Sequence, residues 1–254
     1  MEKTTAYFLI VIMLALCGCS QKENFVSTDK NASVDVVESY VVDGSVSSEM
    51  DESVIDTKLL RVPNLNQNPT LPTGCEATAA VMVLQYYKED ISIEDFAKHC
   101  LPKSEDFYSK DGALYGPDPN KFFVGDPFSK SGYGCFSPVI IVAVNSNSRL
   151  CRAEKVNVSL EELCHRYIDV DKPVLIWATM NMKPIGEGNS WRLQNGESFI
   201  WPSGEHCMVL VGYDRFNYYF NDPLKGNTVG YEKKTAEERF VALGSQAVKI
   251  EPYN

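Results

Sequence analysis

The sequence predicts an α+β fold, in which helices fill the first half of the folded part and antiparallel strands the second. Residues 74–87 are apolar on nearly every side, which is typical of a buried helix. Residues 174–179 form a short, fully apolar run, as a buried strand does. The runs 206–213 and 218–221 flank the turn-forming segment 214–217, which indicates a hairpin. Helices and antiparallel strands that are separated along the chain favour the α+β class.

An edge strand and two capped helices are predicted in the first half of the folded part. Residues 59–65 look like an edge strand that enters a proline-containing loop. Ser92-Ile-Glu-Asp95 resembles a capping box, which opens a helix to about Cys100. Ser159-Leu-Glu-Glu162 has the same form and caps a helix to about Ile168.

The remaining segments complete the expected order of elements. Residues 103–138 are rich in Gly, Pro, Asp and Tyr, so we expect a long ordered loop region there. Residues 235–243 are expected to be helical, and residues 246–250 to form a last strand.

The composition excludes several classes of protein. The 254 residues are 44% hydrophobic and 23% charged, which is ordinary for a globular chain. The net charge is −10, from 24 Lys and Arg against 34 Asp and Glu, and no basic stripe is present. Binding to nucleic acid needs clustered positive charge, so we expect no nucleic-acid partner.

Residues 1–18 are predicted to be a lipoprotein signal peptide. An apolar run from Ala6 to Leu16 follows one lysine, is too short to cross about 30 Å of hydrocarbon, and ends in small residues. Leu16-Cys-Gly-Cys19 resembles a bacterial lipobox, which implies cleavage before Cys19 and lipid attachment to its thiol. A plain secretory signal is the alternative. We expect an extracytoplasmic protein that is lipid-anchored to a bacterial membrane.

Residues 19–57 are expected to comprise the lipidated cysteine and an acidic, disordered tether. Residues 20–57 carry nine acidic side chains against two lysines and show no sustained apolar period. As a random coil this segment would span about 35 Å. A strand over residues 36–42 is the alternative. The folded domain would then occupy residues 58–254.

Cys75 is the candidate nucleophile. It falls at the start of the predicted apolar helix, where the helix dipole and unpaired N–H groups favour an anion, so we expect a lowered thiol pKa. Gln67 lies eight residues upstream, and its amide could donate to an oxyanion beside the Cys75 N–H. The alternative is a small, buried core cysteine.

His206 and Asp222 are the candidate base and its orienting carboxylate. His206 begins one strand of the predicted hairpin, and Asp222 ends the other. The hairpin should bring the two side chains to one end of the sheet. A carboxylate that accepts from one imidazole nitrogen fixes the tautomer, and the other nitrogen can then take the thiol proton.

These motifs resemble those of the C39-like cysteine peptidases of bacteria. The resemblance covers about residues 59–251 and is carried by Val62-Pro63, Gln67, Leu71-Pro-Thr-Gly-Cys-Glu76, Leu84-Gln-Tyr-Tyr87, Phe123-Val-Gly-Asp-Pro127, Gly132-Tyr-Gly-Cys135, His206-Cys-Met-Val-Leu-Val-Gly-Tyr-Asp214 and Asn221-Asp-Pro223. It implies a papain-like α+β fold, with the nucleophile helix packed on an antiparallel sheet. It also implies Gln67 in the oxyanion hole, Cys75 as nucleophile, His206 as base and Asp222 as orienter.

Further hypotheses concern metal binding, disulfides, and the roles of the tryptophans and of two glutamates. Each histidine has a cysteine neighbour, but no Cys-x-x-Cys spacing exists, so we predict neither a metal nor a cofactor. Disulfides are possible in an exported domain, and none is predicted. Trp177, Trp191 and Trp201 are interpreted as core residues. Residues 122–127 could line a cleft or pack the loop, and Glu76 and Glu205 are read as supporting or solvated.

The predicted function is that of a lipid-anchored thiol hydrolase, most simply a monomeric peptidase acting on peptide-like substrates. The alternatives among enzymes are a peptidoglycan amidase or endopeptidase and a transglutaminase-like acyl transferase. The alternative from another class is a tethered binding module that does not turn over its ligand.

Overall fold

The fold is seen in a computed structural model that describes residues 57–253. The predicted signal peptide, Cys19 and the tether up to residue 56 lie outside the described residues. Among residues 57–253, no helix has both the length and the apolar character that a membrane span requires.

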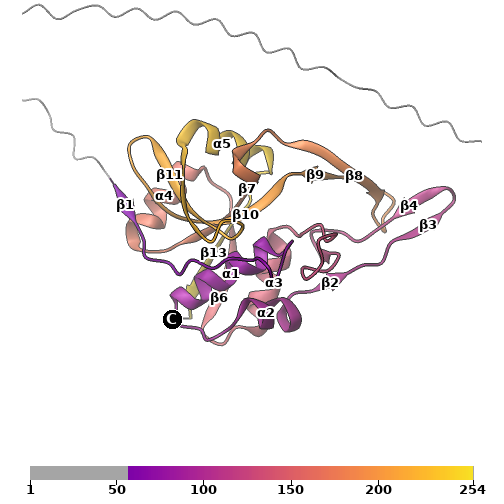
Figure 1. Ribbon diagram of the computed structural model, residues 1–254, viewed down its shortest axis with the longest axis horizontal. Helices are drawn as coiled ribbons and strands as arrows, with labels where there is room; N and C mark the ends of the chain where they lie inside the picture. The colour runs from indigo at the N-terminus through magenta and orange to yellow at the C-terminus, as the bar shows by residue number, and fades with distance from the viewer. Residues whose placement is uncertain (1–56, 254) are drawn as a thin grey trace, which may run out of the picture. The chain divides into compact units, whose positions relative to one another are not determined.

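A seven-stranded sheet forms the centre of the fold (Figure 1). Its order is β12-β11-β10-β7-β13-β6, with β1 also pairing with β10, and every pairing is antiparallel. The predicted α+β class is therefore confirmed, and so is the hairpin, which is made by β10 and β11. The strands are β1 (Lys58–Leu59), β6 (Cys151–Val156), β7 (Val174–Thr179), β10 (Glu205–Tyr213), β11 (Asn217–Asp222), β12 (Asn227–Glu232) and β13 (Ala247–Pro252).

Helix α1 (Cys75–Tyr86) packs against β10, and its first ten residues are all buried. A helix with apolar side chains on every side can be stable only inside a core, as predicted for this segment. Two other helices lie against the same sheet: α3 (Ser137–Asn147) contacts β6, and α5 (Lys233–Ala242) contacts β7.

Both predicted helix caps are present. Ser92 accepts a hydrogen bond from the Asp95 N–H and opens α2 (Ile93–Asp95), which continues as a π-helical turn over Phe96–Cys100. Ser159 accepts from the Glu162 N–H and opens α4 (Leu160–Arg166). Short 3₁₀ turns follow at Ile168–Val170 and Met180–Met182.

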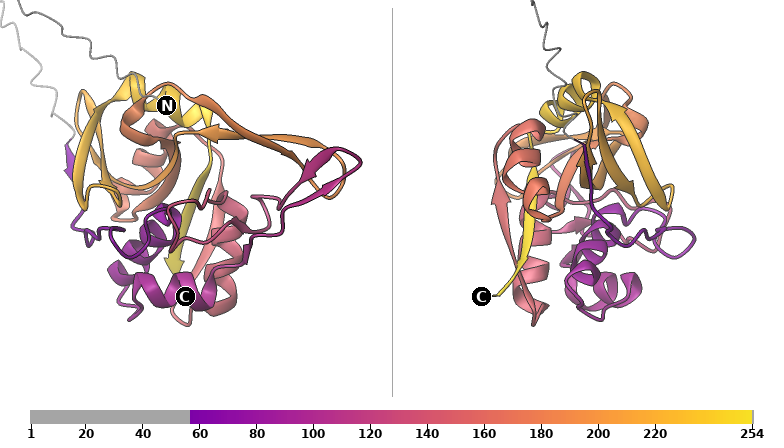
Figure 2. Two further views of the ribbon diagram at one scale, coloured as in Figure 1. Left: turned by 45° about the vertical axis from the view of Figure 1, so that its right-hand side comes forward. Right: turned by 90° about the vertical axis from the view of Figure 1, so that its left-hand side faces the viewer.

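A second sheet extends away from the first as an arm (Figures 1 and 2). Its order is β3-β4-β8-β9, and Trp191 of β8 and Trp201 of β9 form a small buried cluster with Val124. A further parallel pair joins β2 and β5. These strands are β2 (Lys103–Ser104), β3 (Tyr108–Lys110), β4 (Ala113–Tyr115), β5 (Phe123–Val124), β8 (Gly186–Arg192) and β9 (Ser198–Ser203).

The arm corrects the expectation of a loop over residues 103–138. That region holds four short strands and the first residues of α3. Each of these strands has only two or three residues, too few for a visible alternation, and β3 is exposed at all three of its positions. The expected strand at 59–65 is also shorter, because pairing ends near Leu60, whose N–H donates to the Val211 carbonyl at 2.7 Å. Pro63 has no N–H to offer a ladder.

Trp177 links the central sheet to the segment that precedes α3. Its side chain on β7 is fully buried, and its Nε1–H donates to the Cys135 carbonyl at 2.9 Å. Trp177→Phe should therefore destabilise the fold by about 2–3 kcal/mol, because it leaves a cavity and a buried carbonyl without a donor. Urea unfolding of the full chain measures this. Tyr253→Phe, at a half-exposed site, is the control and should change stability by less than about 0.5 kcal/mol. Equal stability of Trp177→Phe and the parent would contradict this account of the core.

Candidate active site

A cavity of about 220 Å³ lies where the start of α1 meets the start of β10. Three of the four predicted catalytic residues line it: Gln67, Cys75 and His206. The fourth, Asp222, lies behind His206. The remaining lining residues are Pro72, Thr73, Gly132, Tyr133, Met180, Trp201, Gly204, Glu205 and Leu224.

Cys75 is the first residue of α1 and is 6% exposed. Gly74 precedes it, and a Cβ at Gly74 would lie only 2.8 Å from Leu71 Cβ. The glycine therefore lets the loop close tightly on the helix start. This places the thiol beside backbone N–H groups that an α-helix leaves unpaired in its first turn.

His206 and Asp222 form a buried pair. Asp222 ends β11, one position beyond Asn221, which pairs with Val209 of β10. His206 lies three positions before Val209, so the hairpin carries both side chains at the same end of the sheet. His206 Nε2 lies 2.7 Å from Asp222 Oδ1, and the side chains are 2% and 1% exposed. Burial opposes ionisation of Asp222, but hydrogen bonds from His206 and the Leu224 N–H outweigh it and lower the pKa of its carboxyl. An ionised carboxylate can only accept, so His206 Nε2 carries the hydrogen.

Gln67 is held by the strand end that carries Asp222. Its backbone N–H donates to the Pro223 carbonyl at 2.9 Å. Its side-chain Nε2 donates to the Pro72 carbonyl at 3.0 Å, which leaves the second amide hydrogen available. Asn221 fixes the approach of this loop, because its Nδ2 donates to the Val62 carbonyl at 3.1 Å.

Glu76 and Glu205 lie closer to the thiol than the sequence indicated. Both are buried, so of the two interpretations given for them, supporting or solvated, the solvated one is wrong. Cys75 Sγ donates to Glu76 Oε2 at 3.2 Å, and the Cys135 N–H donates to Glu76 Oε1. The sequence signal was present in the direct neighbours of Cys75 and His206. Only the packing of α1 on β10 shows that the two carboxyls meet.

The expectation of a lowered thiol pKa is wrong for the structure as it stands. Burial and the charge of the adjacent Glu76 are the two largest causes, and they raise the pKa of Cys75 well above its usual value. The Cys207 N–H donates to the sulfur and opposes this shift only in part. The helix start favours a thiolate, but here a buried carboxyl at hydrogen-bond distance outweighs it.

One group of side chains in residues 57–253 is close enough to contact a single metal ion. Cys75 Sγ and one carboxylate oxygen each of Glu76 and Glu205 lie within 4.8 Å of one another. The Cys75 thiol already donates a hydrogen bond to Glu76, and no histidine belongs to the group. We assign no metal or cofactor to them. The six described cysteines are all free thiols.

The aromatic predictions are resolved by burial. Trp177, Trp191 and Trp201 are all buried, as expected for core residues. Phe123 and Val124 are fully buried and pack the loop, and residues 122–127 do not line the Cys75 cavity, although Phe122 lines a second cavity.

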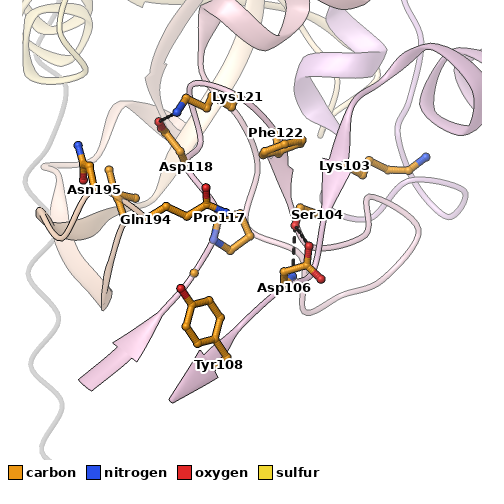
Figure 3. A pocket seen from close by; sticks show the side chains of 12 residues that line it. Lys103, Ser104, Asp106, Tyr108, Pro117, Asp118, Lys121, Phe122, Gln194 and Asn195 are labelled. Atoms are coloured by element: carbon orange, nitrogen blue, oxygen red, sulfur yellow. Dashed lines mark hydrogen bonds and ion pairs between the residues drawn. The ribbon is translucent and has the colours of Figure 1, made fainter. Parts of the chain in front are cut away.

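A second cavity, of about 160 Å³, lies at the base of the arm (Figure 3). Tyr108, Pro117 and Phe122 contribute apolar walls. Its charged groups are satisfied locally: Lys121 pairs with Asp118 at 3.8 Å, and Asp106 accepts from Ser104 at 3.0 Å. No cysteine or histidine is among its lining residues, so it carries none of the predicted chemistry.

Known proteins are similar to this chain in sequence and in structure. The model of the Peptidase_C39 like family matches residues 59–248. YvpB of Bacillus subtilis (strain 168), which is described as uncharacterized, is 28% identical over 183 residues, or 72% of this chain and 71% of YvpB. A crystal structure of a candidate C39-like peptidase from Bacillus anthracis has a TM-score of 0.67 and 29% identity, covering 78% of this chain and 99% of that chain. The chain belongs to the Peptidase_C39 like family, and its α+β architecture is the papain-like one that this membership implies.

Proposed function

We propose that this protein is a lipid-anchored, extracytoplasmic cysteine peptidase that acts through Cys75, His206 and Asp222, with Gln67 in the oxyanion hole. The observation that carries the proposal is the buried 2.7 Å hydrogen bond between His206 and Asp222, at a cavity that Cys75 and Gln67 also line. A buried, ionised carboxylate such as Asp222 is costly to maintain for stability alone. Its position beside a thiol supports a role in proton transfer.

The base in this proposal is His206 Nδ1. Because Nε2–H is committed to Asp222, Nδ1 carries the lone pair that can accept the Cys75 proton. For that transfer the thiol exchanges its hydrogen bond to Glu76 for one to Nδ1. The imidazolium that forms is stabilised by the ionised Asp222.

The thiolate then attacks the substrate carbonyl carbon, and the carbonyl oxygen becomes an oxyanion. The Cys75 N–H at the helix start and the Gln67 amide are the donors we assign to that oxygen. The imidazolium gives its proton to the leaving amine, which departs and leaves a thioester on Cys75. Water, deprotonated by the same imidazole, hydrolyses the thioester and regenerates the thiol.

The first prediction concerns the nucleophile. Cys75→Ala should abolish turnover of peptide substrates by the full chain, because no other described cysteine lines the cavity. Cys164→Ala is the matched control: that cysteine is also buried, but it lies on α4 away from the cavity, and the variant should keep the parent's rate. Product release from a panel of peptides, muropeptides and glutamine donors is the measurement.

The outcome on this panel also separates the alternatives. Activity only on muropeptides would favour the amidase or endopeptidase, and transfer only to amines would favour the acyl transferase. A Cys75→Ala variant as active as the parent would exclude thiol chemistry. A parent that binds but converts nothing in the panel would favour the tethered binding module.

The second prediction concerns the orienting carboxylate. Asp222→Asn should lower kcat/KM by a factor of about 10 to 10⁴, because an amide neither fixes the tautomer nor stabilises the imidazolium. Asp214→Asn is the control on the same hairpin. Asp214 accepts from the Phe216 and Asn217 N–H groups at the turn, so its loss should affect stability rather than turnover. Unchanged kinetics in a folded Asp222→Asn variant would remove Asp222 from the mechanism.

The third prediction concerns the anchor. Two acyl chains on Cys19 would give stable membrane residence, since each buried CH₂ contributes about 0.8 kcal/mol. The parent should therefore enter the detergent phase in a Triton X-114 partition, and Cys19→Ser should not. Cys17→Ser is the control and should still partition into detergent. A parent protein found in the aqueous phase without lipid mass would refute the anchor and leave the peptidase proposal intact.

A further inference from the structure

Two buried carboxyl groups converge on one glycine beside the nucleophile. A Cβ on Gly134 would lie 2.5 Å from Glu76 Oε1 and 3.1 Å from Glu205 Oε2. Gly134 has φ +147°, a backbone conformation that side chains rarely adopt. Glycine at this position thus leaves room for both carboxyls. Two carboxylates this close and this buried cannot both ionise easily, so the site favours one retained proton.

The hydrogen bonds differ between the two groups. Glu76 accepts from the Cys75 thiol, from the Cys135 N–H and from its own N–H, and each of these stabilises a negative charge. Glu205 Oε1 is buried without a hydrogen-bond partner among the described residues. The charge is therefore better placed on Glu76 and the proton on Glu205.

The groups that face this pair come from three segments. Cys75 faces it from α1, His206 and Cys207 from β10, and Cys135 from the loop before α3. Of these, His206 would favour ionisation of Glu76 by charge when it is an imidazolium. Burial raises the pKa of Glu76, and burial together with the Glu76 charge raises the pKa of Glu205 well above its usual value.

We propose that Glu76 and Glu205 are positioning residues that hold Cys75 in its protonated resting form: Glu205 keeps its proton at neutral pH, and ionised Glu76 accepts the hydrogen bond of the thiol. The proposal deepens the peptidase mechanism and rests on it for its functional meaning. The thiol then has two partners in turn. It donates to Glu76 at rest and to His206 when substrate fills the cavity.

The test is the pH dependence of Cys75 alkylation, which needs no turnover. The full chain is treated with iodoacetamide between pH 5 and 10, and labelling of the Cys75 peptide is followed by mass spectrometry. Glu76→Gln should lower the midpoint by about 1–3 pH units, because it removes a charge in contact with the sulfur. Glu205→Gln should leave the midpoint nearly unchanged, because it replaces one neutral group by another. Glu197→Gln, on the exposed arm, is the control.

Each other outcome overturns the assignment. Equal decreases in both variants mean two charged carboxyls, no decrease in either means that Glu76 is not charged, and a decrease in Glu205→Gln alone reverses the roles. A midpoint that moves when EDTA is added to the parent means that the cluster holds a metal instead. If the variants show the expected midpoints but the parent has no hydrolase activity, the peptidase proposal is contradicted and the assignment of Glu76 and Glu205 stands.

A second measurement covers the case in which Glu76→Gln does not fold. A carboxyl that stays protonated in the folded state but ionises in the unfolded state makes the fold less stable as the pH rises past about 4.3. The stability of the parent, measured by urea unfolding, should therefore fall relative to that of Glu205→Gln as the pH rises. The folding equilibrium constant should decrease by about tenfold per pH unit, up to the folded-state pKa of Glu205. A constant difference between pH 5 and 8 would show that Glu205 holds no proton and would overturn the proposal.

Discussion

The burial of α1 is the constraint on which the rest of the site depends. Ten consecutive residues of the helix are buried. The helix can bury all of its sides only when it packs against the sheet at β10, which it contacts. That arrangement puts its first turn, and with it Cys75, at the end of β10 where His206 lies. The thiol's place is thus fixed by apolar packing along the helix rather than by polar contacts at the site.

The neighbouring elements are tied to this point by hydrogen bonds from residues that do no chemistry. Trp177 on β7 holds the Cys135 carbonyl, and the Cys135 N–H holds Glu76. On the other side, the Pro223 carbonyl holds the Gln67 N–H beside the end of β11. Loop residues that line the cavity therefore take their positions from the sheet. Catalysis requires reacting groups to be held in fixed positions, and these hydrogen bonds to the sheet hold the cavity residues in this way.

Sequence reasoning succeeded where the signal is local. The two serine caps, the apolar strand at Val174–Thr179 and the hairpin each depend on residues close in the chain, and all were found. The arm was missed because β8 is exposed at six of its seven positions and has no apolar alternation. The thiol pKa was misjudged because its two largest causes are the burial of Cys75 and the charge of Glu76. Both depend on how the start of α1 packs against β10, which no sequence spacing reveals.

The charges around Cys75 bear on how the proposed peptidase would act. His206 and Asp222 can neutralise each other as an ion pair, so a free thiolate beside an ionised Glu76 would leave two uncompensated negative charges in a buried site. Such charges cost several kcal/mol each. When the sulfur attacks a carbonyl, however, its charge moves to an oxyanion that Gln67 and the helix start can bind. The Glu76 carboxylate then raises the free energy of the free thiolate more than that of the tetrahedral state. An interaction assists catalysis when it favours the later state over the earlier one in this way. In this arrangement the thiolate forms when substrate fills the cavity, and its attack passes the charge on to the oxyanion.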